Sequence, residues 1–485
     1  MSGPTAEQAR LVGHSALELS ALIHRREVSC VEVMSAHLAQ IERYNPMLNA
    51  IVALRDPDDL LAEARERDEE LAAGRSRGWM HGFPHAIKDL AAARGLPHTF
   101  GSRIFVDRVA EADDLHVGRI RAAGAIIIGK TNTPEFGLGS QTYNEVWGTT
   151  ANPYDVARTA GGSSGGGAAA LAARMVPVAD GSDNMGSLRN PPAFTNVVGL
   201  RPSWGRVPDP GFVPYGSVNG PMGRTVADVA RLLSTMAGPD NASPLCIDED
   251  PGPLSAELDR DFAGTRIAWV GDWDGYLAME PGILPLCESA LATFEGLGCE
   301  VEPALPAYAP QEIWDSYLAW RAWGNLGYGD LYREPSTRRL MKPELVWEIE
   351  HGLRLTALDL TRAVAARNAW YAAVAGMFER YDYIVAPSAQ VFPFETSVHW
   401  PETIDGRPMD TYHRWMETVV PWTMAGHPVA ALPAGFDPRG LPTGIQVIGR
   451  RHGDHGVLQL AHAYETASPV MDGTAPPLLT AGRGD

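Results

Sequence analysis

The stretch TAGGSSGGGAAALAARMVPVADGSDNMGSLRNPP (Thr159–Pro192) gathers Gly and Ser into two clusters, around Ser163–Gly167 and around Ser182–Ser187. An apolar, Ala-rich segment separates the clusters, and a flexible Gly/Ser linker would not contain such a segment. Glycine is used where the backbone approaches a ligand closely or adopts a positive φ. Two Gly-rich loops joined by an Ala-rich helix can return the chain to one site. We therefore expect Ser163 and Ser187 to serve the same site.

A serine hydroxyl is a poor nucleophile until a base removes its proton, and no histidine lies close by in the sequence. The candidate base is Lys88, in the segment Gly82-Phe-Pro-His-Ala-Ile-Lys88-Asp89, where it follows a short apolar strand. Partial desolvation disfavours the ammonium and lowers its pKa. Lowering the pKa of a lysine from about 10.4 to 7–8 costs about 3–4 kcal/mol, and the stability of a core of this size can offset that cost.

Two local patterns imitate other active sites, and their context argues against both. Gly124–Thr131 matches the P-loop spacing, but its variable residues are Ala and three Ile, which predict a strand instead of a phosphate-binding turn. Gly162–Gly166 matches the nucleophile elbow of α/β-hydrolases, but the preceding Asn152–Ala160 is polar and turn-rich and does not predict a core strand. The 14 histidines are dispersed, and no cluster has metal-ligand spacing, so we expect neither a metal nor a cofactor.

Bulk composition narrows the class of protein. The chain has 485 residues, of which 45 % are hydrophobic and 20 % charged, which is typical of a globular protein with a large core. Its net charge of −19 argues against a nucleic-acid partner and against anionic membranes. Met1–Arg10 lacks the order of a signal peptide, and no apolar run approaches the length of a membrane span. The four cysteines are scattered along the chain, which is typical of a protein whose thiols stay reduced, so a cytoplasmic location is expected (Cys30, Cys246, Cys287, Cys299).

Hydrophobic patterning predicts strands that alternate with helices. A capping box at Ser29–Glu32 begins a helix that Asn45-Pro46 is expected to end. Further helices are expected at 58–73, 114–123, 225–237, 285–295, 310–331 and 356–380. Strands are expected at 49–54, 125–128, 177–179, 266–270, 383–386, 429–433 and 445–448. This alternation predicts α/β layers around a largely parallel, buried sheet.

Several motifs together resemble the amidase signature family. They are spread over about residues 15–465: Gly82-x-Pro84-x-x-x-Lys88-Asp89, Gly129-Lys-Thr-Asn132 with Glu135-Phe136, Asn152-Pro153, Arg158-Thr159, Gly161–Gly166, Gly181-Ser-Asp183, Gly186-Ser187-Leu-Arg189 with Pro191, Val198–Pro202, Gly220–Asp228, Ala431-Leu-Pro433 and Gly444-Ile-Gln446.

The resemblance implies one amidase signature domain over residues 1–485, with an α/β fold whose large, twisted, mostly parallel mixed sheet is covered by helices on both faces. Its parts would be a helical part at about 1–75, a signature core at about 76–235, a variable substrate-cleft part at about 240–425 and C-terminal core elements at about 426–470. It also implies a catalytic triad in which Ser187 is the nucleophile, Ser163 the bridging serine after a cis peptide to Gly162, and Lys88 the terminal base.

The same resemblance implies an oxyanion hole formed by backbone N–H groups of Asn184, Met185, Gly186 and Ser187. The family usually has Thr or Ile and then Gly in this loop, as in Asp-Thr-Gly-Gly-Ser, whereas this chain has Asn184-Met185. Met185 could shape the pocket floor or fill core behind the loop, and both interpretations stay open. Gly167 and Pro192 also differ from the usual Ser and Ala. Arg189 is expected to brace the loop through a buried pair with Asp183.

Aromatic residues in the second half of the chain indicate which kind of substrate the site would bind. In this family the less similar half generally supplies the cleft walls, so we expect Gly162, Met185, Trp320, Tyr412 and Trp415 to bind substrate. Trp314, Tyr317, Trp320 and Trp323 form a helical stripe that could instead only pack the helix onto the core. No further Arg or Lys stands out as a carboxylate clamp.

The resulting hypothesis is an amidase for small, uncharged, hydrophobic or aryl amides, with anilides, carbamates and esters as candidates. The alternative is a transamidase A-type subunit that releases ammonia from glutamine within a complex. Such subunits usually carry Gln after the loop Arg, where this chain has Asn190. A catalytically inactive binding protein is a third hypothesis. A homodimer is compatible with the family resemblance.

Overall fold

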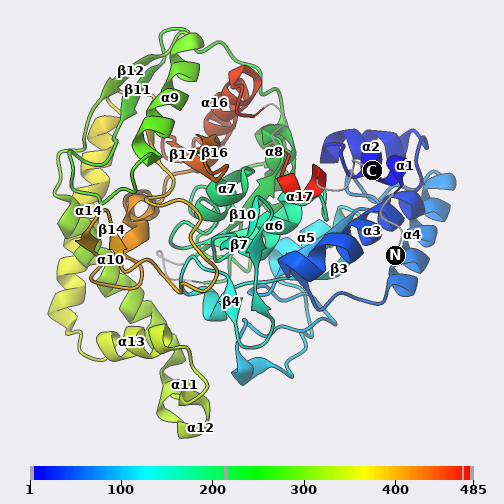
Figure 1. Ribbon diagram of the computed structural model, residues 1–485, viewed down its shortest axis with the longest axis horizontal. Coiled ribbons are helices and arrows are strands. Elements are labelled where there is room, and N and C mark those ends of the chain that lie inside the picture. The colour runs from blue at the N-terminus through cyan, green and yellow to red at the C-terminus, as the bar shows by residue number, and fades with distance from the viewer. Residues whose placement is uncertain (1–4, 212–216, 472–474, 481–485) are drawn as a thin grey trace.

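The computed structural model describes residues 5–211, 217–471 and 475–480, so residues 1–4 of the polar Met1–Arg10 segment lie outside it. Its centre is an eight-stranded sheet in the order β12-β11-β13-β17-β16-β9-β10-β8 (Figure 1). The strands are β8 (Ala179–Asp183), β9 (Val198–Arg201), β10 (Val218–Gly223), β11 (Arg266–Trp269), β12 (Glu300–Pro303), β13 (Tyr383–Pro387), β16 (Val429–Phe436) and β17 (Pro442–Ile448).

The sheet is mixed, as expected, but the prediction that it is mostly parallel is wrong. In the described part of the chain β11 is parallel to β12 and to β13, whereas the other neighbouring pairs of this sheet are antiparallel. Helix α7 (Asn190–Thr195) connects β8 to β9, and these strands do run in the same direction. However, β10 lies between them and is antiparallel to both. Alternation along the chain therefore does not give the direction of spatial neighbours.

Helices cover both faces of this sheet, as predicted, because successive side chains of each strand point to opposite faces. On β13, Val385 packs with α9 (Ile283–Gly296) and α16 (Asp454–Ala467). Its neighbour Ile384 packs on the other face with α10 (Pro310–Asn325), α14 (Ala357–Met377) and α15 (Val420–Ala425). The sheet is therefore the middle of three layers, with one apolar core on each side of it.

A smaller sheet in the order β1-β3-β2 carries the lysine. Strand β2 (Pro84–Lys88) runs parallel to β3 (Ile126–Thr131), and β1 (Ile51–Val52) is antiparallel to β3. The Ile-rich residues of the false P-loop are thus the buried strand β3, as the sequence predicts. The expected strand at 49–54 shrinks to the two residues of β1. Lys88 is the last residue of β2, so its side chain leaves the sheet where the strand ends.

The first helices pack beside this smaller sheet. Helix α3 (Cys30–Leu48) begins with the predicted capping box at Ser29, but Pro46 does not end it. A proline removes one backbone donor, and near the C-terminal end of a helix that loss does not stop the last turn.

The remaining helices and short strands of the described chain lie around these two sheets. They are α1 (Ala6–Leu11), α2 (Ala16–His24), α4 (Pro57–Ala72), α5 (Leu115–Ala122), α6 (Gly165–Ala172), α8 (Val226–Met236), α17 (Pro477–Thr480), and the short strands β4 (Tyr143–Asn144), β5 (Gly148–Thr149), β6 (Ala151–Asn152), β7 (Asp155–Thr159), β14 (Thr403–Ile404) and β15 (Arg407–Pro408).

The helix expected at 310–331 is broken. Helix α10 ends at Asn325, and a single 3₁₀ turn leads into α11 (Gly329–Arg333), α12 (Pro335–Arg338) and α13 (Pro343–Gly352). Helices α11 and α12 project from the lower edge of the molecule in Figure 1. In the ranges that the structure describes, no helix is both long enough and apolar enough to cross a membrane.

Candidate active site

The two Gly/Ser clusters meet as predicted, because helix α6 carries the chain from the first to the buried strand β8 that leads into the second. All eight residues of α6 are buried, and it packs against both β8 and β2. A Cβ on Gly165 would overlap the Thr142 hydroxyl, and one on Gly166 would overlap the backbone of Asn132. The glycines of the first cluster thus permit the close packing of α6. The peptide bond between Gly162 and Ser163 is cis.

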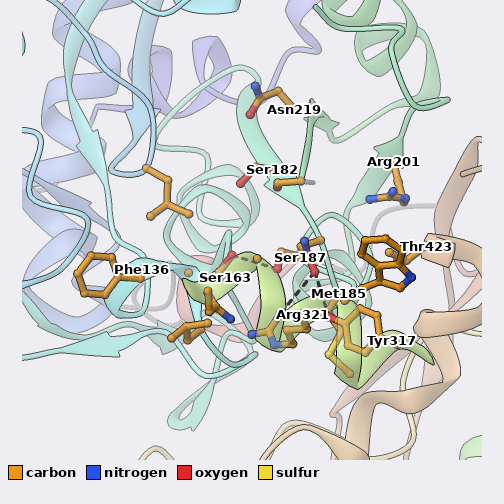
Figure 2. A pocket seen from close by; sticks show the side chains of 18 of the residues that line it. Phe136, Ser163, Ser182, Met185, Ser187, Arg201, Asn219, Tyr317, Arg321 and Thr423 are labelled. Carbon is orange, nitrogen blue, oxygen red and sulfur yellow. Dashed lines mark hydrogen bonds between the residues drawn. The ribbon is translucent and has the colours of Figure 1, made fainter. Parts of the chain in front are cut away.

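Lys88, Ser163 and Ser187 form one continuous hydrogen-bonded chain. Lys88 Nζ lies 2.8 Å from Ser163 Oγ, and Ser163 Oγ lies 3.0 Å from Ser187 Oγ. The three residues are 1 %, 3 % and 6 % exposed, and both serines line the same cavity. Figure 2 shows Ser163 and Ser187 joined in this way. The arrangement can move a proton from Ser187 to Lys88 through one intervening hydroxyl.

The surroundings of Lys88 favour a neutral amine near pH 7. Burial lowers the pKa of Lys88 from 10.5 to about 7, while the carboxylates of Asp180 and Asp183 oppose that shift. Lys88 Nζ also lies 2.9 Å from Ser164 Oγ and 3.1 Å from Ser182 Oγ. The expectation of a desolvated lysine therefore has a physical cause in this fold, since the amine is enclosed by hydroxyl groups and has no direct ion pair with a carboxylate among the described residues.

Behind Lys88 lies a buried cluster that the sequence did not reveal. Asp180 Oδ1 lies 3.2 Å from His85 Nε2, and Asp180 Oδ2 lies 3.8 Å from His116 Nε2. Burial would raise the pKa of Asp180, but its interactions with His116 and His85 lower it below its ordinary value. The three residues come from β8, β2 and α5, so they looked dispersed in the sequence. A charged residue within the buried Gly-rich segment was the one available signal.

Asp183 fixes the loop that follows β8. Arg189 donates from Nε and Nη2 to the two Asp183 carboxylate oxygens, at 2.9 Å each, and Arg201 Nη1 lies 3.3 Å from Oδ1. Burial would raise the pKa of Asp183, but the charges of Arg189 and Arg201 lower it below its ordinary value. The expected buried Asp183–Arg189 pair is thus present, and Arg201 is a third member that was not expected.

The same carboxylate binds one of the four expected oxyanion donors. The Gly186 N–H donates to Asp183 Oδ1 at 2.9 Å, so in this structure that group is already engaged. The backbone N–H groups of Asn184, Met185 and Ser187 remain as candidates. Gly186 has φ of +84°, which requires glycine, whereas Met185 is not among the described residues with positive φ. Replacing the usual glycine by Met185 therefore places no strain on the backbone.

A cavity of about 480 Å³ opens over the two serines, and its wall combines aromatic and aliphatic residues with polar and charged ones, among them Asp114, Arg201, Asp209, Asn219, Arg321 and Arg367. Its aromatic lining residues are Phe100, Phe136, Trp204, Tyr317, Trp320, Trp323 and Tyr328, and its aliphatic ones include Leu90, Leu138, Met185, Met416 and Met424. Figure 2 shows Met185 and Tyr317 beside Ser187, with Phe136 on the opposite side of Ser163. Met185 lines the cavity and also belongs to a buried apolar cluster, so each of the two interpretations of this residue holds in part.

Two of the expected substrate-binding residues line this cavity, and three do not. Met185 and Trp320 are in its wall, while Gly162, Tyr412 and Trp415 are not among the described lining residues. Tyr412 is buried behind the wall, where its hydroxyl donates to Glu348, and Trp415 Nε1 donates to the Tyr412 carbonyl. Helix α10 shows both roles considered for its stripe: Trp314 packs in the core, and Tyr317, Trp320 and Trp323 reach the cavity.

Arg321 is a cavity residue that sequence reasoning missed. It lies on α10 one position after Trp320, and its Nε donates to Glu348 Oε1 at 2.5 Å. Both members of this ion pair are buried, with side chains 7 % and 1 % exposed. The pair neutralises the guanidinium, so the cavity carries an arginine without a free positive charge at this point. The spacing of four from Tyr317 was the only local signal, since i and i+4 share a helix face.

Comparison with known proteins agrees with this geometry. A family model described as Amidase matches residues 32–458. The chain is 36 % identical over 464 residues to an acylamidase of Rhodococcus erythropolis, covering 94 % of this chain and 96 % of that protein. It is 34 % identical over 479 residues to the A-type subunit of the glutamyl-tRNA(Gln) amidotransferase of Methylococcus capsulatus, covering 93 % and 96 %.

Among solved structures, a bacterial aryl acylamidase of the amidase signature enzymes superposes with a TM-score of 0.88 at 29 % identity, covering 97 % of this chain and 99 % of that one. The chain therefore belongs to the amidase signature family. It is an amidase, a hydrolase that acts on amide C–N bonds.

Proposed function

We propose that this amidase hydrolyses small, uncharged, hydrophobic or aryl amides through an acyl-enzyme on Ser187. The observation that carries the proposal is the hydrogen-bonded chain Lys88–Ser163–Ser187, which ends at a cavity with several aromatic residues in its wall. Anilides and aryl carbamates are the substrates that combine a flat apolar ring with a carbonyl small enough to reach Ser187. The acylamidase and aryl acylamidase relatives support the same class.

The reaction begins with neutral Lys88. Its Nζ accepts the Ser163 hydroxyl proton while Ser163 Oγ accepts the proton of Ser187, and Ser187 Oγ attacks the carbonyl carbon. The C–N bond then breaks as the relay runs backwards and protonates the leaving nitrogen, which departs as the free amine. Water, deprotonated by the same relay, attacks the acyl carbon, releases the acid and restores the Ser187 hydroxyl. The proton that leaves with the amine is replaced by one from the attacking water, so the triad regains its original protons at the end of each cycle.

The loop after β8 would stabilise the negative charge that forms on the carbonyl oxygen. The Met185 and Ser187 N–H groups, with that of Asn184, are the proposed donors, and removal of one such donor typically costs about 3–4 kcal/mol of transition-state stabilisation. The buried cluster of Asp183 with Arg189 and Arg201 adds one net positive charge beside this loop. That charge favours the oxyanion further, because electrostatic effects are strong in a site that excludes water.

A glutamine-dependent transamidase subunit is the second candidate, and the identity to the Methylococcus capsulatus protein is the observation that favours it. Two features of this chain argue for a free-standing amidase. Asn190 stands where such subunits usually carry Gln, and its side chain is used in the core, donating to the Ser388 carbonyl at 2.8 Å. The cavity wall includes seven aromatic residues in its described lining, which offer flat apolar surface to an aryl group.

Labelling and kinetics test the proposal. A fluorophosphonate should add one adduct to the intact protein, Ser187→Ala should abolish it, and peptide mapping should place it on Ser187. The purified chain should then turn over an anilide with a higher kcat/KM than an aliphatic amide of equal size, and both faster than an anionic amide. The highest kcat/KM for the anionic amide would refute the substrate class. Turnover of glutamine alone, dependent on an added partner, would instead establish the transamidase.

A further inference from the structure

The side chain of Asn184 has a use that the proton relay does not explain. Asn184 directly follows β8 and begins the loop that ends at Ser187, at the position where the family usually has Thr or Ile. Its Oδ1 accepts a hydrogen bond from the Tyr317 hydroxyl at 3.0 Å and lies 3.4 Å from Arg321 Nη1. Tyr317 and Arg321 are one helical turn apart on α10, so one face of that helix holds the beginning of the loop.

These contacts form a chain that extends well away from the loop. Arg321 Nη1 donates to the Tyr317 hydroxyl at 3.1 Å, and that hydroxyl in turn donates to Asn184. Arg321 is itself held by Glu348 of α13 and by the Tyr412 hydroxyl, which lies 2.9 Å from Nη2. In a buried site such successive hydrogen bonds strengthen one another. The orientation of Asn184 is therefore set by helices α10 and α13, far away in the sequence.

The two ends of the loop are thus fixed by different partners. Asp183 holds the far end, where the Gly186 and Leu188 N–H groups donate to its carboxylate at 2.9 and 3.0 Å. In the described residues the Asn184 side chain is held from the α10 side through its oxygen, and Arg201 donates to the carbonyl of Asp183 just before it. Between these two anchors lies the peptide group that joins Asn184 to Met185, and its N–H is one of the proposed oxyanion donors.

We propose that Tyr317 and Arg321 are positioning residues that hold the Asn184 side chain and thereby aim the Met185 N–H at the carbonyl oxygen of the substrate. The inference rests on the proposed acyl-enzyme reaction at Ser187 and deepens it. It also accounts for asparagine where the family usually has Thr or Ile, because the asparagine carbonyl reaches away from the backbone and offers an acceptor to both donors. An oxyanion donor acts more strongly on the transition state than on the bound substrate, so the clamp contributes to kcat more than to KM.

Tyr317→Phe tests the clamp, because it removes one hydroxyl and keeps the ring in the cavity wall. A hydrogen bond of this kind corresponds to a loss of about three- to tenfold in kcat for an anilide, with KM within about twofold. The inhibition constant of a trifluoromethyl ketone, whose adduct with Ser187 carries an oxyanion, should rise by the same factor. Asn184→Ala should show the same pattern, and the double variant should be no slower than the slower single variant.

Tyr276→Phe is the matched control, since Tyr276 packs against the same apolar cluster and also donates to a buried carboxylate, Glu417, at 2.8 Å. It should leave kcat and KM as in the parent. An unchanged kcat in Tyr317→Phe, a change confined to KM, additive losses in the double variant, or an equal loss in Tyr276→Phe would each overturn the clamp. Should Tyr317→Phe fail to fold, Asn184→Ala and its affinity for the ketone decide the question.

Fluorophosphonate labelling separates this inference from the proposed function. All clamp variants should still form the Ser187 adduct, more slowly than the parent protein. If the parent protein forms no such adduct, the proposed function itself fails. If the parent protein reacts at Ser187 and the variants react at the same rate, the clamp alone is wrong.

Discussion

Lys88→Met is the substitution that most directly tests whether Lys88 is neutral in the folded protein. Burial lowers the pKa of Lys88 from 10.5 to about 7, and each pH unit of displacement corresponds to 1.36 kcal/mol, so the whole effect is about 5 kcal/mol. In the unfolded chain the amine keeps its ordinary pKa and stays protonated up to about pH 10. Between these two values the unfolded state therefore holds about one more proton at this position than the native state.

The sign of the pH dependence follows. Below pH 7 both states carry the proton, and the full cost of a buried ammonium weakens the native state. As the pH rises from 7 towards 10.5, the native amine is neutral and that cost disappears, so stability increases. From pH 7 to pH 9 the free energy of unfolding of the parent protein should rise by about 2 kcal/mol relative to that of Lys88→Met, which lacks the group.

Proton uptake on unfolding measures this difference without requiring reversibility. At pH 8.5 calorimetry in buffers of different ionisation enthalpy should find about one more proton taken up by the parent protein than by Lys88→Met. Equal uptake by the two proteins would refute the assignment, because Lys88 would then keep its ordinary pKa. The rate should agree: kcat/KM should rise about tenfold per pH unit below pH 7 and level off above it, and Lys88→Met should lose about 10²- to 10⁴-fold.

Two further substitutions test the supports of the site. Arg189→Met should lower the free energy of unfolding by about 3–5 kcal/mol, because it leaves the buried Asp183 with Arg201 as its one remaining ionic partner among the described residues, and denaturant titration should detect this as a lower midpoint. Stability within about 0.5 kcal/mol of the parent would show that the pair does not brace the loop. Trp320→Ala should reduce kcat/KM about tenfold for an anilide and much less for acetamide, because only the aryl group is large enough to bury surface against this wall. Equal losses for both substrates would place the aryl ring elsewhere.

Much of the fold and the catalytic site was predictable because local chemistry constrains it. The buried strand β3 and the capping box of α3 follow from patterns within a few residues. The two Gly/Ser clusters flanking an Ala-rich helix predicted a shared site, and Lys88 followed from its place at the end of an apolar strand. The family resemblance supplied the roles of these residues and the cis peptide before Ser163, which the structure contains.

Other features depended on contacts between segments that are distant in the sequence. The sheet is less parallel than expected because β10 inserts between β8 and β9. The Gly186 N–H is engaged by Asp183 because the loop curls back on its own strand. Tyr412 looked like a cleft residue, yet it lies behind Arg321, where its hydroxyl serves the ion pair with Glu348.

The sequence by itself determined which residues can carry out the chemistry: a lysine that the chain must bury, and two serines in loops that only glycine-rich backbone can bring so close. The tertiary structure decided what holds those residues in place. Asp180 meets His85 and His116 across three elements, and Asn184 meets Tyr317 across 133 residues of chain. Sequence spacing and composition do not predict such pairings, because a hydrogen bond depends on the distance and angle between two groups in space. That distance and angle are fixed only after the layers have packed.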